Sequence, residues 1–273
     1  RNQYDGYLIF DADNLVDPNF VSEMNKVFDS GNYGAITCYR NSRNFGANWI
    51  SAGYAIWFLR EARFLNFPRT LLGTNCHVSG TGFLVSARLV EENLRRPQCV
   101  GVKLYPGYNH QYISDPMYTP VYKLARTYHK PVAVHMGQTA GSTGKLKYSH
   151  PLTLDEVAAD WPDVQFVMCH FGNPFLEAAA AVLEKNPNVC ADLSGLLEGR
   201  ADLDRYFVER AGYVGLLRTW MDYLGCWDRF LYGTDWPIVN LAEYRDYVTR
   251  IVPEERRPAV FFDNANRVYG LGL

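Results

Sequence analysis

Three apolar segments of this sequence each lead into a side chain that can bind a metal or move a proton. Residues 131–137, 164–172 and 230–237 present His135, His170 and Asp235 after their apolar runs. Continuous apolar runs of this length, closed by glycine or proline, are typical of buried strands in a parallel sheet. The carboxyl ends of parallel strands lie at one edge of the sheet. The pattern therefore predicts that two histidines and one aspartate converge there.

The rest of the sequence supplies five more strand-like segments, separated by stretches with helical spacing. They are residues 7–10, 33–39, 71–78, 99–105 and 189–193. A long aromatic helix is expected over about 49–66, closed by Pro68. Alternation of strands and helices predicts a parallel α/β sheet, and eight such units in 273 residues predict a single (β/α)8 TIM-type barrel over 1–273.

In such a barrel the functional residues lie at the carboxyl ends of the strands. There the sequence places Asp11 and Asp13 after the first strand, Lys103 on the fourth, and the His135, His170 and Asp235 trio. Imidazole and carboxylate ligands suit zinc, manganese or iron. Each residue alone also has a structural interpretation, such as a hydrogen-bonded histidine, a capping aspartate or a lysine paired with an acid. The trio at one edge favours metal binding, with Asp235 also accepting a proton. His170 is expected either to bind the metal or to polarise a substrate carbonyl or hold an oxyanion.

Composition limits the classes of partner. A net charge of −2 gives no electrostatic case for nucleic acid or an anionic membrane, and no apolar run approaches the length of a membrane span. The six cysteines form no C-x-x-C pair, and three of them lie in apolar strand-like runs, which favours reduced thiols in a cytoplasmic protein. A small-molecule substrate is the expected partner, and a homo-oligomer is compatible with the sequence.

From about residue 97 onward the sequence resembles the metal-dependent amidohydrolase superfamily, in the branch of aminocarboxymuconate-semialdehyde decarboxylase. The resemblance is carried by these stretches: GVKLYP at 101–106, VAVHMG at 132–137, MCHFG at 168–172, DLSG at 192–195, YGTDWP at 232–237 and NANRVYG at 264–270. It implies a barrel in which His135 and Asp235 bind one divalent metal beside His170. It also implies hydrolysis, or non-oxidative decarboxylation, of a small carboxylate-bearing substrate. From their positions near the strand ends, Lys103, His110 and Trp236 are the expected substrate contacts, with a solvated loop as the alternative for His110.

The first strand departs from that family, which has His-x-His where this sequence has Asp11-Ala12-Asp13. Two carboxylates are harder ligands and favour manganese or magnesium over zinc. Residues 7–93 resemble family 2 glycosyltransferases, in which Asp11 and Asp13 would be the metal-binding Asp-x-Asp. The matching stretches are FDADNLVDPNF at 10–20, NWISAGY at 48–54 and VSGTGF at 78–83. A preceding nucleotide-binding half and the transferase's catalytic-base motif are absent.

The two resemblances therefore predict a chimera, with a glycosyltransferase-like segment over 1–95 and an amidohydrolase-like segment over 96–273. Three hypotheses follow. The first is a metal-dependent hydrolase or decarboxylase of amidohydrolase type. The second is a sugar-nucleotide-dependent glycosyltransferase that uses Asp11 and Asp13. The third is a catalytically inactive chimeric scaffold, and metal content separates it from both enzymes.

Overall fold

The structure is a computed structural model that describes residues 5–9, 15–78 and 82–273. Its contacts divide the chain into two compact units, Arg1–Asn93 and Leu94–Leu273. The division lies beside the Arg95-Arg96-Pro97 stretch, where the sequence changes character. The two units are described in turn.

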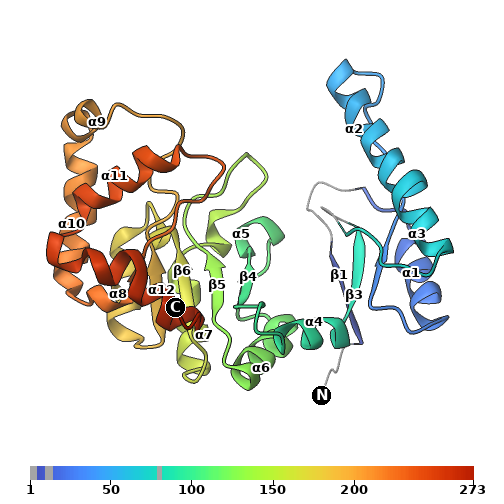
Figure 1. Ribbon diagram of the computed structural model, residues 1–273, viewed down its shortest axis with the longest axis horizontal. Helices are drawn as coiled ribbons and strands as arrows, with labels where there is room; N and C mark the ends of the chain where they lie inside the picture. Colours follow the sequence, from blue (N-terminus) through green and yellow to red (C-terminus); the bar gives the residue numbers. More distant parts are fainter. Residues whose placement is uncertain (1–4, 10–14, 79–81) are drawn as a thin grey trace. The chain divides into compact units, whose positions relative to one another are not determined.

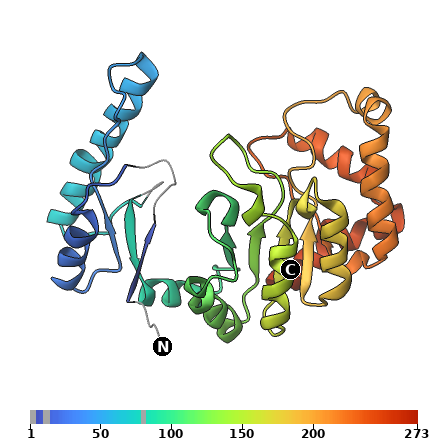
Figure 2. The same cartoon turned by 180° about the vertical axis from the view of Figure 1, so that it is seen from behind.

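The first unit contains a three-stranded antiparallel sheet in the order β1-β3-β2. Both views agree that α1 and the continuous α2–α3 helix lie on the same side of this sheet (Figures 1 and 2). Its elements are β1 (Gly6–Ile9), α1 (Phe20–Asp29), β2 (Ala35–Thr37), α2 (Trp49–Leu59), the π-helical η1 (Arg60–Asn66), α3 (Phe67–Leu71), β3 (Phe83–Ser86) and α4 (Ala87–Leu94).

The long aromatic helix continues past the point where proline was expected to end it. Asn48 caps its start by accepting a hydrogen bond from the Ser51 N–H at 3.0 Å. The helix then widens into the π-helical turns of η1, and Pro68 falls within the first turn of α3. Proline is tolerated in a first turn because its missing N–H has no partner to lose there. The strand expected over residues 71–78 is therefore wrong, and the third strand is Phe83–Ser86.

The second unit contains a five-stranded parallel sheet in the order β4-β5-β6-β7-β8 (Figure 1). Its strands are β4 (Val102–Leu104), β5 (Val132–His135), β6 (Phe166–Cys169), β7 (Val189–Asp192) and β8 (Phe230–Leu231). Its α-helices are α5 (Pro106–Asn109), α6 (Thr119–Tyr128), α7 (Leu152–Asp160), α8 (Leu176–Lys185), α9 (Leu203–Glu209), α10 (Ala211–Leu224), α11 (Leu241–Ile251) and α12 (Asn264–Tyr269). Short 3-10 turns η2 to η6 and the π-helical η7 (Ala259–Asp263) complete the unit.

The parallel α/β sheet expected from the sequence is thus present for the last five strands. The expectation of eight parallel strands closing one barrel is wrong for the first three, because β1, β2 and β3 pair antiparallel with one another. An antiparallel pair needs no crossover helix between its strands. These three segments therefore satisfy their backbone hydrogen bonds within their own sheet.

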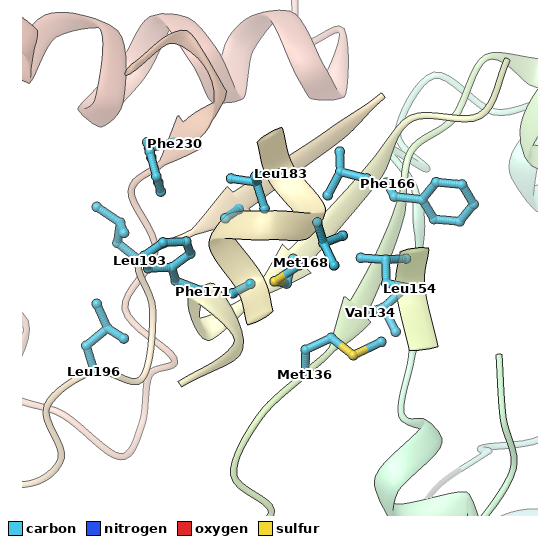
Figure 3. Close-up of a cluster of buried hydrophobic side chains, with 14 of the residues drawn as sticks. Val134, Met136, Leu154, Phe166, Met168, Phe171, Leu183, Leu193, Leu196 and Phe230 are labelled. Carbon is cyan, nitrogen blue, oxygen red and sulfur yellow. The ribbon is translucent and has the colours of Figure 1, made fainter. Parts of the chain in front are cut away.

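Alternating side chains of the parallel strands pack against the helices and form the main core. Val134, Met168 and Phe230 point to this side, and all three are fully buried. Figure 3 shows Phe171 next to Leu193 and Phe230, and the Phe171 and Phe230 rings meet edge to face with centroids 5.2 Å apart. Burial of each such side chain contributes about 1.5–3 kcal/mol.

The intervening residues of the same strands face the other side of the sheet. There Ala133, Val167, Cys190 and Leu231 pack against Val268 of α12. The period of two also places Lys103, His135, Cys169 and Asp192 on this face. The fold therefore sets a row of ionisable side chains at the carboxyl ends of the strands, on the face opposite the large core.

A carboxylate links α7 to α8 and makes part of the stability depend on pH. Asp155 accepts hydrogen bonds from Lys185 Nζ at 2.7 Å and Asn186 Nδ2 at 2.7 Å. Burial alone would raise the pKa of Asp155, but Lys185 and Asn186 lower it below its ordinary value.

Because the folded-state pKa of Asp155 is lowered, its contribution is complete above the unfolded value of about 4 and is lost as the pH falls through the folded value. We expect Asp155→Asn to lower the free energy of unfolding by up to about 1 kcal/mol at neutral pH. The difference from the unchanged protein, measured in urea titrations, should shrink as the pH falls through the lowered folded-state pKa of Asp155. Asp160→Asn, which changes an exposed carboxylate of the same helix, serves as the control. If Asp155→Asn lowers the free energy of unfolding equally at neutral and acid pH, the ionised Asp155 carboxylate is not the source of the stabilisation.

Among the described residues, no helix combines the length and the apolar character needed to span a bilayer. All six cysteines are free thiols.

Candidate active site

His135 ends β5 and lies in an aromatic enclosure. Its ring stacks on Tyr105 with centroids 5.8 Å apart, and the edge of Tyr108 approaches at 5.1 Å. The side chain is almost completely buried, and its Nε2 lies 2.9 Å from the Gln138 carbonyl oxygen. Burial, reinforced by the charge of the neighbouring His170, lowers the pKa of His135 to about 4. The ring is therefore held neutral at physiological pH, which is the form that binds a metal.

His170 follows β6 and touches His135 directly. Its Nε2 lies 3.0 Å from His135 Nδ1, and its Nδ1 lies 3.1 Å from the Ser194 carbonyl oxygen. His170 adopts a left-handed backbone conformation with φ of 61°, as does Phe171 after it. This conformation turns the chain sharply after β6. Two strand ends expected to meet from the sequence therefore do meet, through their imidazole rings.

The partners of the two rings allow their protons to be counted. His135 Nε2 faces a carbonyl oxygen, which only accepts, so this nitrogen donates. His170 Nδ1 faces the Ser194 carbonyl oxygen and, at 3.0 Å, the Ser194 hydroxyl, whose own proton goes to Asp192 Oδ1, so this nitrogen donates too. Two neutral imidazoles carry one N–H each, and both are used in this way. The inner contact then needs a further proton, so the pair is suited to hold one positive charge.

Asp192, at the end of β7, binds the backbone of His170 and so helps to position the histidine pair. Its Oδ1 accepts hydrogen bonds from the His170 N–H at 2.9 Å, the Ser194 N–H at 3.0 Å and the Ser194 hydroxyl at 2.5 Å. Burial alone would raise the pKa of Asp192, but the charges of His170 and Lys103 and these hydrogen bonds lower it. Asp192 thus remains ionised and fixes the backbone that carries His170.

Gly195 brings the third member of the trio into place. A Cβ atom at Gly195 would lie 2.8 Å from His170 Nδ1 and 3.4 Å from Asp235 Oδ2. The His170 ring and the Asp235 carboxylate therefore border the same glycine, which has a φ of 63°. Asp235 is exposed and itself has a φ of 61°. Its carboxylate is accessible to a ligand, in contrast to the buried histidines.

Lys103 reaches the same region from β4. Its Nζ lies 2.6 Å from the Cys169 Sγ and 5.5 Å from the Tyr105 ring centroid. Burial would lower the pKa of Lys103, but Cys169 and Asp192 raise it. The ammonium group therefore stays charged, close enough to His135 to help lower the pKa of that ring.

The remaining predicted site residues are only partly accounted for. His110 ends α5, and its Nε2 lies 2.7 Å from the Thr143 carbonyl oxygen, so a loop holds its ring in place. The Trp236 ring is 68% exposed beside Asp235. Asp11 and Asp13, the predicted replacements for the histidine pair of the first strand, lie outside the described residues.

The side chains of the candidate site are of the types that bind a divalent ion, but too few of them lie close together among the described residues to complete a site. Two imidazoles and one carboxylate are typical of zinc, manganese and iron sites. Within residues 5–9, 15–78 and 82–273, however, no three His, Cys, Asp or Glu side chains gather closely enough to form a metal cluster. A complete site therefore needs further ligands.

Comparison with known proteins places this arrangement in a family. The family model described as amidohydrolase matches residues 81–271. The match spans well over half of the chain, so the chain belongs to the amidohydrolase family. No sequence of a curated protein matches it. None of these comparisons supports the glycosyltransferase resemblance of the first segment.

Two solved structures illustrate the fold. An uncharacterized TIM-barrel protein from Bordetella bronchiseptica aligns with a TM-score of 0.53 at 22% identity, covering 68% of this chain and 62% of its own. A dihydroxybenzoic acid decarboxylase from Polaromonas sp. JS666, solved with manganese and the inhibitor 2-nitroresorcinol, aligns with a TM-score of 0.50 at 15% identity. That alignment covers 69% of this chain and 66% of the decarboxylase. The present chain therefore spans somewhat under two thirds of each of these proteins, and the likeness is one of fold.

Proposed function

We propose that this chain is a metal-dependent hydrolase or non-oxidative decarboxylase of amidohydrolase type, acting on a small carboxylate-bearing substrate. Two observations carry the proposal: His135 and His170 are in direct contact at the carboxyl edge of a parallel sheet, and His170 and Asp235 both border Gly195. Family membership supports the reaction class. A bound divalent ion would supply Lewis-acid activation of water or of a substrate oxygen.

The residues of the chain have separable roles in this proposal. His135 and Asp235 hold the ion. Asp235, being exposed, also moves a proton, from water in hydrolysis or to the substrate carbon in decarboxylation. His170 donates a hydrogen bond to the reacting oxygen, and Lys103 attracts the substrate carboxylate. His110 and Trp236 are proposed as further substrate contacts.

Metal content of the purified chain tests the proposal directly. We expect about one equivalent of manganese or zinc per chain, because the site holds a single ion. The double variant His135→Ala/Asp235→Asn should lose it, together with any metal-dependent activity. The matched control His129→Asn/Asp222→Asn changes an exposed histidine and an exposed aspartate of the same unit. Asparagine tolerates the left-handed conformation of His129, so this control should keep its metal.

Activity is then sought with two substrate sets: aromatic and unsaturated carboxylic acids for carbon dioxide release, and carboxylate-bearing lactones and amides for hydrolysis. Well-folded protein without metal would contradict the enzyme proposal and leave the inactive scaffold. Metal retained by the double variant would place the ion elsewhere and would also contradict it.

A further inference from the structure

The charges of the first unit are strongly segregated along the sequence. Between Asp29 and Glu91 there are six arginines, no lysine and one acidic residue, Glu61, which gives this stretch a net charge of +5. The whole chain has a net charge of −2. The overall charge therefore conceals one strongly basic surface region.

The same stretch contains the α2–α3 rod, defined as the continuous helix over residues 49–71. At 1.5 Å per residue it is about 34 Å long. In both views α2 extends beyond the ends of the strands of its own unit (Figures 1 and 2). Only Ser51, Ala55 and Glu61 of the rod are buried. The rod is therefore a convex surface with few contacts to its own sheet.

The exposed side of the α2–α3 rod is apolar to an unusual degree. Trp49 is 83% exposed and Phe64 is 71% exposed, whereas singly exposed apolar residues are the rule on protein surfaces. The other large apolar side chains exposed along the rod are Ile50, Tyr54, Ile56, Trp57, Leu59, Phe67 and Leu71. Aromatic and branched aliphatic groups are thus mixed along its whole length.

Most of the arginines in this region are exposed on the surface of the first unit. Glu61 is used internally, because Arg40 Nη2 lies 2.6 Å from its carboxylate. Arg43, Arg60, Arg63 and Arg69 are exposed, and the described part of the chain provides no ion pair for any of them. The Arg60 guanidinium lies 5.5 Å from the Trp57 ring centroid, so a cation and an aromatic group are presented together.

We propose that the α2–α3 rod is a peripheral binding site for an anionic membrane surface. The rod would lie in the plane of the interface, with Trp49, Trp57 and Phe64 in the boundary between headgroups and acyl chains. The arginines would contact lipid phosphates. Helices that bind in this way combine aromatic and aliphatic side chains with basic ones, and tryptophan favours the headgroup level.

The chemistry of the rod favours a membrane over other anionic partners. Single-stranded nucleic acid is bound by aromatic rings that line a groove, and exposed Ile50, Ile56 and Leu71 gain nothing from phosphates or sugars. A protein partner would have to enclose apolar groups on a convex helix 34 Å long, whereas an acyl layer conforms to such a ridge. Both alternatives are distinguished by the experiment below.

Co-sedimentation of the full chain with sucrose-loaded vesicles tests the proposal. Phosphatidylcholine vesicles containing about 30% phosphatidylglycerol are compared with pure phosphatidylcholine at about 0.1 M NaCl, where surface charges act over about 10 Å. We expect at least tenfold stronger binding to the anionic vesicles. Each basic residue near such a surface contributes about a fivefold factor. Arg63→Gln/Arg69→Gln should therefore weaken binding about 25-fold.

Apolar insertion is tested separately by Trp57→Gln/Phe64→Gln, which should weaken binding at least tenfold. The control Val208→Gln/Arg256→Gln replaces an exposed apolar residue and an exposed arginine of the second unit, and should bind within about twofold of the unchanged chain. All the substituted side chains are exposed, so circular dichroism and thermal unfolding should be unchanged.

Several results would overturn the proposal. Equal binding to neutral and anionic vesicles would remove the role of the arginines. Unchanged binding of Trp57→Gln/Phe64→Gln would remove insertion. If the chain instead forms dimers that Trp57→Gln/Phe64→Gln abolishes, without vesicle binding, the rod is an interface between two copies. Binding to single-stranded DNA but not to vesicles would assign the rod to nucleic acid.

Discussion

Replacing Gly137 with alanine is expected to lower the free energy of unfolding by about 2–5 kcal/mol. Gly137 follows β5 with a φ of 86°, where any side chain is strained. A Cβ atom there would lie 2.0 Å from the Asn173 carbonyl oxygen and 2.7 Å from the Gly172 carbonyl carbon. Both are backbone atoms of the loop after β6. The two loops therefore approach as closely as only glycine permits.

The same change should disturb the candidate site. The Gln138 N–H donates to the Asn173 carbonyl at 2.8 Å, and the Gln138 carbonyl accepts from His135. Moving the two loops apart to admit a methyl group would break the first hydrogen bond and turn the His135 ring. We therefore expect Gly137→Ala to reduce metal content as well as stability. Urea unfolding and metal analysis of the same sample measure both effects.

Gly141→Ala is a matched control for backbone strain. Gly141 lies in the same loop with a φ of 76°, but no atom lies within 4 Å of an added Cβ. Gly141→Ala should lower the free energy of unfolding only by the strain of the left-handed backbone, about 1–2 kcal/mol, and should leave metal binding intact. If Gly137→Ala and Gly141→Ala destabilise the chain equally, the close approach to Asn173 does not exist.

The strands of the second unit could be predicted because their sequence signal is local. Val132–His135 and Phe166–Cys169 are continuous apolar runs bounded by proline, glycine and polar residues. Both faces of these strands are covered, one by helices and one by α12, which removes the alternation expected of a half-exposed strand. Counting strand–helix units in the sequence predicted eight strands. It could not predict which strands pair with one another, because strand pairing is set by contacts between residues far apart in the sequence.

The first unit shows where the sequence signal is ambiguous. The apolar spacing over residues 49–66 predicted a helix correctly, but Pro68 suggested an end that the π-helical turns of η1 make unnecessary. The apolar residues Leu71 and Leu72 then suggested a strand, although both are more than 70% exposed. An exposed apolar run and a buried one look identical in the sequence, so burial was the missing information.

For the site, the sequence predicted which strand ends carry histidine but not the groups that support them. The direct contact of His135 with His170 agrees with the expected convergence at one edge. Asp192 was not singled out as a functional residue, although it also ends an apolar strand. Applying the rule for strand ends to all ionisable residues would have found it. Tyr105 and Tyr108 carry no such signal, because aromatic residues are common in cores.

The net charge of the chain and the local charge of its first unit lead to different expectations about an anionic surface. A value of −2 averages an arginine-rich stretch over 30–90 with acidic segments on either side. Binding to a surface responds to charge within about a Debye length of the contact, not to the total. The four exposed arginines between residues 43 and 69 act locally in this sense.

Replacing Asp192 with alanine is expected to lower the free energy of unfolding by about 2–4 kcal/mol and to remove most activity of the site. The change leaves the His170 N–H, the Ser194 N–H and the Ser194 hydroxyl without their acceptor. Hydrogen bonds to a charged acceptor contribute about 1.5–3 kcal/mol each, and bonds that share one oxygen are not additive. Freed from Asp192, the backbone at His170 should relax from its left-handed conformation, and its ring should leave His135.

Asp192→Asn separates the geometry from the charge. Its amide oxygen can still accept from the same donors, so His170 should stay in place and the loss of stability should be about 1 kcal/mol. We expect metal content to be kept in Asp192→Asn and reduced in Asp192→Ala, because only the latter displaces His170. The exposed Asp246→Ala is the control for removing a carboxylate from the same unit. Equal effects of Asp192→Ala and Asp192→Asn would mean that Asp192 acts through its charge alone and does not position His170.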